Sequence, residues 1–266
     1  MRRIDVTLLA LSIVSAPVRA QIGMSPVQDY INKTTLLNNI LSNSRATAMS
    51  QRAQTNSSGN RAGSTRANAT SPSAFTHTGR SILPAALAER TRNGNVDQRT
   101  AQQFFESQID LYKRTAANDG FPPNEVAYAL EYFIVNTYMT YHDLHDVPYE
   151  KDPRVKRGKD SFDRIAIINE KKTLKPTMLQ ERAVFNQMQA VLAANPALAK
   201  MTDRDKQELT ELLAIMMGVN YTAYLRGVNA EDERLMAQAR QTAREQLERL
   251  LGTPIDRIKI DERGVY

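Results

Sequence analysis

The segment His142-Asp-Leu-His145-Asp could bind a metal ion, because it holds two of the three histidines in the chain. If the preceding helix continues through it, His142 and His145 lie three residues apart on one helical face, where two imidazoles can bind Zn²⁺ or Cu²⁺ together. A zinc site needs a third or fourth ligand, and the sequence offers none at a metal-site spacing. The pattern therefore favours a polar helix end and predicts no cofactor, with a metal at His142 and His145 as the alternative.

A second candidate is the long connection over residues 151–175, which carries nine Lys or Arg and four Asp or Glu. Such a segment could form a contact patch for a phosphate, a lipid headgroup or a polyanion. The interspersed acids also fit a solvated loop of mixed charge, although long loops inside a compact domain are often functional. The residues of this candidate contact patch are Arg154, Lys156, Arg157, Lys159, Arg164, Lys171 and Lys172.

Motifs of nucleophilic or nucleotide chemistry are missing from the sequence. It contains no Cys, no G-x-S-x-G, no P-loop and no G-x-G-x-x-G, and His77 is the one histidine outside the segment at 142–146. A pair of acidic residues of the glycosidase type has no local spacing rule, so the many Asp and Glu residues leave that chemistry open. Catalytic residues are therefore unknown, and the sequence favours a role other than catalysis.

The elements that would position these residues are helical. Apolar residues recur at three- and four-residue steps in five stretches, and capping residues, Gly or Pro bound most of them. This predicts an all-α bundle of about five helices, with a further short helix begun by Ser161 and a tail that could hold a short strand. The five helices are expected near 96–117 and 123–144, from the capping box at Thr177 to Asn195-Pro196, after Thr202, and from about 229 to Gly252.

The first 80 residues have a different composition. Residues 1–20 combine Arg2-Arg3, an apolar run and small residues before a cut after Ala20, as in a secretory signal peptide. Residues 21–41 predict a short amphipathic helix, and residues 42–80, rich in Ser, Thr, Asn and Arg, predict a disordered linker. The folded helical domain is then expected over 81–266, in a bacterial protein that is exported to the periplasm or secreted.

Two stretches carry a resemblance to a known family. The stretch GFPPNEVAYALEYFIVNTYMTYHDL and the later DRDKQELTELLAIM with its GTPIDRIKI ending resemble a bacterial exported family that is defined only as a domain of unknown function. The likeness covers roughly residues 76–266. It implies a helical exported domain, and it supplies no activity and no functional residues.

These observations favour a non-enzymatic helical binding or interaction domain of the cell envelope. The expected partner is an envelope protein or an anionic envelope component rather than a nucleic acid, because the basic excess lies in the leader and the linker and not in the helical part. The alternative is an envelope hydrolase that uses a carboxylate pair, or His142 and His145 with a metal.

The linker hypothesis can be tested by limited proteolysis. Because residues 42–80 lack apolar anchors, trypsin should cut at Arg45, Arg52, Arg61 or Arg66 before it cuts inside 96–251, and leave a stable fragment that begins near 75–90. Mass spectrometry of the early fragments identifies the first sites. Early cuts inside 96–251 with intact linker arginines would contradict the domain map.

Overall fold

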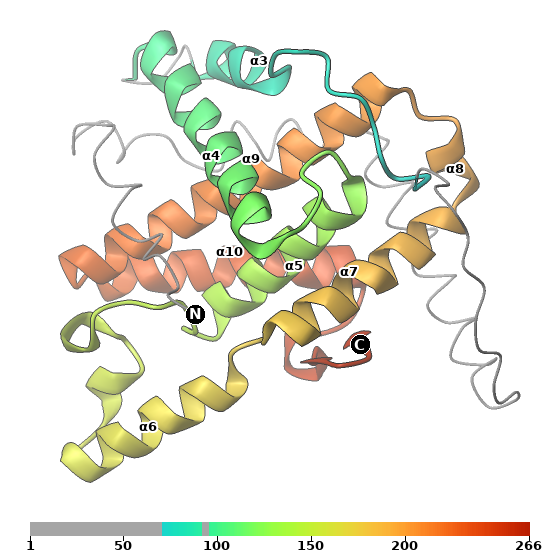
Figure 1. The fold of residues 1–266 in the computed structure, drawn as a ribbon. Helices are drawn as coiled ribbons and strands as arrows, with labels where there is room; N and C mark the ends of the chain where they lie inside the picture. The colour runs from blue at the N-terminus through green and yellow to red at the C-terminus, as the bar shows by residue number, and fades with distance from the viewer. Residues whose placement is uncertain (1–70, 92–95) are drawn as a thin grey trace, which may run out of the picture.

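The computed structural model describes residues 71–91 and 96–266, and it confirms an all-α fold (Figure 1). The chain ends in a small hairpin. The elements are α3 (Leu83–Arg90), α4 (Gln98–Asp119), α5 (Val126–Tyr141), the 3₁₀ turns η3 (Tyr149–Lys151) and η4 (Val155–Arg157), α6 (Ser161–Leu174), α7 (Met178–Ala193), α8 (Pro196–Ala199), α9 (Asp203–Ala230), α10 (Glu233–Leu251), η5 (Ile255–Arg257), β1 (Ile260–Asp261) and β2 (Gly264–Val265).

Helix α5 is the centre of the bundle. It packs against α7, α9 and α10, and α4 covers the other side of α9 together with α3 (Figure 1). Almost every residue of α5 is buried, which explains why its aromatic residues are not confined to one face. Tyr128, for example, lies against Tyr112, with ring centroids 5.1 Å apart, and against Phe121 at 4.9 Å. Tyr128, Tyr132 and Phe133 of this helix are therefore part of the core.

Local capping fixes most of the helix ends, as the sequence predicts. Thr177 and Gln180 form a complete capping box at the start of α7, and Thr202 forms a second with Asp205 at α9. Asp232 caps α10 by accepting two backbone N–H bonds. The other end of α10 lies at Gly252, whose φ of 66° is in the left-handed region where a side chain is disfavoured.

The C-terminal tail forms an antiparallel hairpin, in agreement with the expected short strand. Ile260 pairs with Val265, and Asp261 pairs with Gly264. The Gln187 side chain of α7 holds the second strand: its Oε1 accepts from the Val265 N–H at 2.8 Å, and its Nε2 donates to the Val265 carbonyl at 2.9 Å. The side-chain amide of Gln187 thus makes the two hydrogen bonds that the backbone of a neighbouring strand would make, and it holds the tail against α7.

The folded domain begins before residue 81. The prediction of a disordered linker is therefore wrong for residues 71–80, the last ten residues of that segment. Phe75 is buried in the core, and Ser73 Oγ donates to the buried Glu125 carboxylate at 2.8 Å. Further on, Glu211 of α9 accepts from the backbone N–H groups of Ile82 and Leu83, both at 2.8 Å, and so caps α3, which has no side-chain cap of its own. Two buried carboxylates, Glu125 and Glu211, thus help to attach the start of the domain to the bundle.

The predicted signal peptide (1–20), the helix over 21–41 and the linker up to residue 70 lie outside the described residues. Within residues 71–91 and 96–266, the helices lack the combination of length and hydrophobicity that a membrane crossing requires.

Leu213 tests the core assignment. It lies in α9 and is 1% exposed, so Leu213→Ala should leave a cavity and lower the free energy of unfolding by about 2–5 kcal/mol. Leu179→Ala is the matched control, because Leu179 is 62% exposed and should change stability by less than about 0.5 kcal/mol. Urea unfolding measures both. Equal, small effects would mean that this face of α9 is not core.

Candidate functional site

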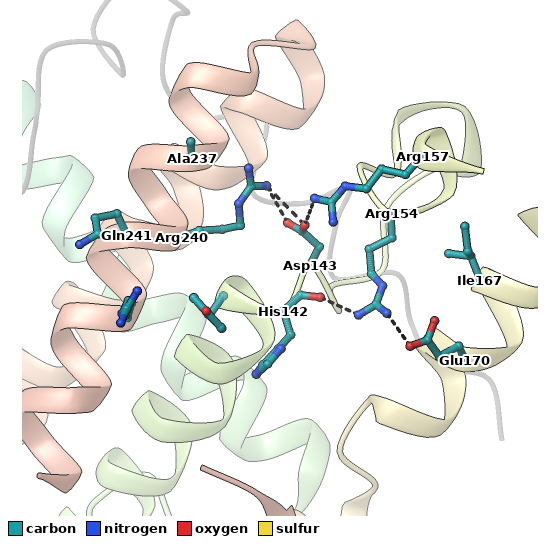
Figure 2. Close-up of a pocket in the computed structure, with 11 residues that line it drawn as sticks. His142, Asp143, Arg154, Arg157, Ile167, Glu170, Ala237, Arg240 and Gln241 are labelled. Atoms are coloured by element: carbon teal, nitrogen blue, oxygen red, sulfur yellow. Dashed lines mark hydrogen bonds and ion pairs between the residues drawn. The ribbon is translucent and has the colours of Figure 1, made fainter. Parts of the chain in front are cut away.

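A pocket of about 580 Å³ opens where three parts of the chain meet (Figure 2). The end of α5 forms one wall, the segment around η4 with α6 forms the second, and one face of α10 forms the third. Its lining residues are Tyr141, His142, Asp143, Arg154, Arg157, Ile167, Glu170, Ala237, Arg240, Gln241 and Arg244. Four of these side chains are guanidinium groups and two are carboxylates, so the lining has an excess of positive charge.

The Asp143 carboxylate lies at the centre of the pocket wall. Its side chain is only 3% exposed, and it accepts from Arg157 Nη2 at 2.9 Å and from Arg240 Nη1 at 3.1 and 3.3 Å (Figure 2). The backbone of Asp143 has a φ of 55°, a left-handed conformation that Asp and Asn tolerate better than most residues. This turn ends α5 and directs the carboxylate between the two arginines.

Arg154 joins the end of α5 to α6. Its Nη1 donates to the His142 carbonyl at 3.1 Å, and its Nη2 pairs with Glu170 at 3.2 Å (Figure 2). Asp152 holds the turn that precedes it, because Asp152 Oδ1 accepts from the Arg154 N–H at 2.9 Å. The buried Asp152 carboxylate also pairs with Lys171 of α6. These polar contacts fix the wall that carries Arg154 and Arg157.

Helix α10 supplies the third wall through residues that sequence reasoning missed. Ala237, Arg240, Gln241 and Arg244 follow the i, i+3, i+4, i+7 spacing of one helical face. Arg244 pairs with Glu248 at 3.1 Å, and Arg240 also pairs with Glu233. The sequence signal for this wall was the pair Arg240 and Arg244, which lie four residues apart on a helix face beside the apolar stripe of α10.

The His142 side chain borders the pocket. Its ring lies against Tyr138 and Tyr141, with centroids 4.3 and 4.8 Å apart, and its buried Nε2 has no hydrogen-bond partner within the described structure. Burial, followed by the positive charge of Arg154, lowers the pKa of His142. The imidazole is therefore neutral at pH 7.

His145 lies in different surroundings, which corrects the expected geometry of the histidine pair. Helix α5 ends at Tyr141, not near residue 144, so the shared helical face of His142 and His145 does not form. His145 is buried; its Nε2 is 2.9 Å from Thr140 Oγ1, and its ring lies 4.5 Å from that of Tyr221. The part of the chain that the structure describes contains no cluster of three or more His, Asp or Glu side chains able to hold a metal ion.

The predicted basic patch divides into three sets. Arg154 and Arg157 line the pocket. Lys156 and Lys171 are committed to ion pairs, with Glu231 at 2.9 Å and with Asp152. The remaining three basic residues are exposed on and beside α6, namely Lys159, Arg164 and Lys172.

The pocket is suited to holding an anion more than to moving a proton. Both carboxylates of the lining are already paired with guanidinium groups, Asp143 with two of them and Glu170 with Arg154. A guanidinium has five N–H donors in a planar fork, so an arginine in one ion pair can still bind a phosphate or a second carboxylate. Arg157 offers the most accessible fork, since its side chain is 61% exposed.

The chain matches a family of unknown function, DUF6683, over residues 3–154 and 175–266. The chain belongs to this family. The matched segments include His142, Asp143 and the pocket face of α10, and they leave out residues 155–174, which hold η4 and α6. No curated protein and no solved structure shows significant similarity to the chain.

His145 predicts how stability depends on pH. Burial, with Lys175 and Lys171 nearby, lowers the pKa of His145 to about 3 in the folded protein, whereas an unfolded histidine has a pKa of about 6.5. Below about pH 6.5 the unfolded chain therefore takes up a proton on His145 that the folded protein does not bind. The free energy of unfolding then falls by roughly 1.4 kcal/mol for each pH unit below this value. Urea unfolding at pH 7 and pH 5 measures this loss.

The variant His145→Gln keeps a hydrogen-bonding side chain and does not titrate, so it should lose clearly less stability between these pH values. His77 and His142, whose pKa values burial also lowers, contribute to the residual dependence. An unchanged pH dependence in His145→Gln would show that His145 is not held neutral in the folded protein.

Proposed function

We propose that this protein is a non-enzymatic binding domain, exported to the cell envelope, whose pocket holds an anionic ligand. The observation that carries the proposal is the lining: four arginines and two carboxylates around a volume of about 580 Å³. Pockets of this size accommodate small organic ligands. Arginine forks recognise phosphate and carboxylate oxygens by paired hydrogen bonds, so a small phosphorylated or carboxylated molecule is the expected ligand class.

Preorganisation supports the proposal. A long arginine side chain loses conformational freedom when it binds a ligand, and this loss weakens binding unless the side chain is already held. Asp143 holds Arg157 and Arg240, Glu170 holds Arg154, and Glu248 holds Arg244. The pocket thus presents its donors in fixed positions before a ligand arrives.

Calorimetric titration with pyrophosphate and with citrate tests this function, the first as a probe for phosphate and the second for carboxylate. We expect at least one of them to bind, and Arg157→Gln to weaken that binding roughly tenfold through the loss of a charge-assisted hydrogen bond. Lys156→Gln is the matched control, because it removes the same charge from the adjacent residue, which pairs with Glu231 and does not line the pocket.

The control should change the dissociation constant less than about twofold, since its effect is limited to long-range charge. Thermal unfolding of both variants verifies that the fold is retained. Absence of binding by both probes, or equal weakening by Arg157→Gln and Lys156→Gln, would contradict a built anion site.

A further inference from the structure

The charged side chains that line the pocket differ in how far a ligand can reach them. The side chains of Asp143, Arg154 and Arg240 are at most 17% exposed, so the walls cover most of their surface. Three other charged side chains of the lining are 44% exposed or more, namely Arg157, Arg244 and Glu170. A ligand that enters the pocket therefore meets two open cations and one open anion.

Glu170 is the open anion, and its carboxylate keeps part of its capacity to accept hydrogen bonds. Its Oε1 pairs with Arg154 Nη2 at 3.2 Å, and Arg154 is its only ion-pair partner among residues 71–91 and 96–266. The side chain is 57% exposed, and an ionised carboxylate has about four acceptor positions, so most of them remain open to a ligand. A protonated amine, with its three N–H donors, is the ligand group that suits these positions.

The position of Glu170 in the pocket is fixed by the contacts of α6 with the segment that follows α5. Lys171, the next residue along the helix, pairs with the buried Asp152, and Lys175 at the end of α6 pairs with Asp146. Figure 2 shows Glu170 on α6, on the side of the pocket opposite α10. The negative group is therefore part of a held wall and faces the volume in which an anion would bind.

We propose that the ligand of this pocket is a small zwitterion, which carries a phosphate or carboxylate group together with a protonated amine. This inference rests on the proposed anion site: the arginines bind the anionic group, and Glu170 accepts from the amine. A ligand with negative charge alone would place that charge beside Glu170, and like charges brought together disfavour binding. Glu170 and Arg157 both lie in residues 155–174, which the family match leaves out, so the preference is expected for this chain and not for the whole family.

Two pairs of compounds that differ by one amino group test the inference by calorimetric titration of the full chain. Phosphoethanolamine is compared with ethyl phosphate, and aspartate is compared with succinate. A site that responds only to negative charge binds the more negative member of each pair more tightly, namely ethyl phosphate and succinate. We expect the opposite order, with the amino compound of at least one pair binding roughly tenfold more tightly through its charge-assisted hydrogen bonds to Glu170.

The variant Glu170→Gln should abolish this preference. It keeps an amide oxygen that can accept from Arg154 and removes the negative charge, so the amino compound should bind more weakly and the plain anion more tightly. Glu150→Gln is the matched control, because Glu150 is exposed and does not line the pocket. The control should change the preference less than about twofold, since its effect is limited to long-range charge. Circular dichroism verifies that both variants keep the fold.

The outcomes separate this inference from the anion site on which it rests. Equal or tighter binding of ethyl phosphate and succinate by the unaltered protein would overturn the inference and leave the anion site intact. The same conclusion follows if neither amino compound binds while pyrophosphate or citrate does. A preference that survives Glu170→Gln would show that Glu170 does not recognise the amine. Absence of binding by all of these compounds would overturn the anion site and the inference together.

Discussion

The ion pairs of Asp143 organise the pocket, because a carboxylate removed from water is stable only when its charge is compensated. Asp143 meets this requirement with two arginines from different parts of the chain, Arg157 of η4 and Arg240 of α10. The same contacts bring the end of α5, the connection that follows it and α10 to one point. The junction thereby brings together the walls that carry the remaining arginines of the pocket, Arg154 and Arg244.

The pocket and helix α6 differ in how they are held. The pocket lies against the bundle, where α5, α9 and α10 share an apolar core, and its arginines are fixed by carboxylates. Helix α6 has no share in that core and is held by Lys171, Lys175 and Glu170. One wall of the pocket, through Ile167 and Glu170, belongs to this projecting helix. The projecting helix is therefore also part of the pocket.

Much of the fold could be predicted from sequence because helix ends depend on nearby residues. The capping boxes at Thr177 and Thr202 and the glycine at residue 252 act over three or four positions, and all lie where they were expected. The end of α5 at Tyr141 depends instead on the turn at Asp143, whose partners lie 14 and 97 residues further along the chain. No local pattern encodes that pairing, so the histidine pair was placed on a helix that does not reach it.

Distant polar contacts also explain the other differences. Residues 71–80 have a linker-like composition, yet Glu125, which directly precedes α5, binds the Ser73 side chain of this region. Glu211 of α9 binds the backbone at the start of α3. In the same way, Arg154 and Arg157 were recognisable as a basic cluster, whereas their assembly with Arg240 and Arg244 required the packing of α10 beside the end of α5.

A double-mutant cycle on Asp143 and Arg240 tests the account most directly. Asp143→Asn keeps a residue that tolerates the left-handed backbone, and Arg240→Gln removes the paired charge. Unfolding free energies of the two single variants and the double variant give the coupling between these side chains. If the buried pair joins the three walls, the coupling should be about 1.5 kcal/mol or more. A coupling near zero would contradict the account.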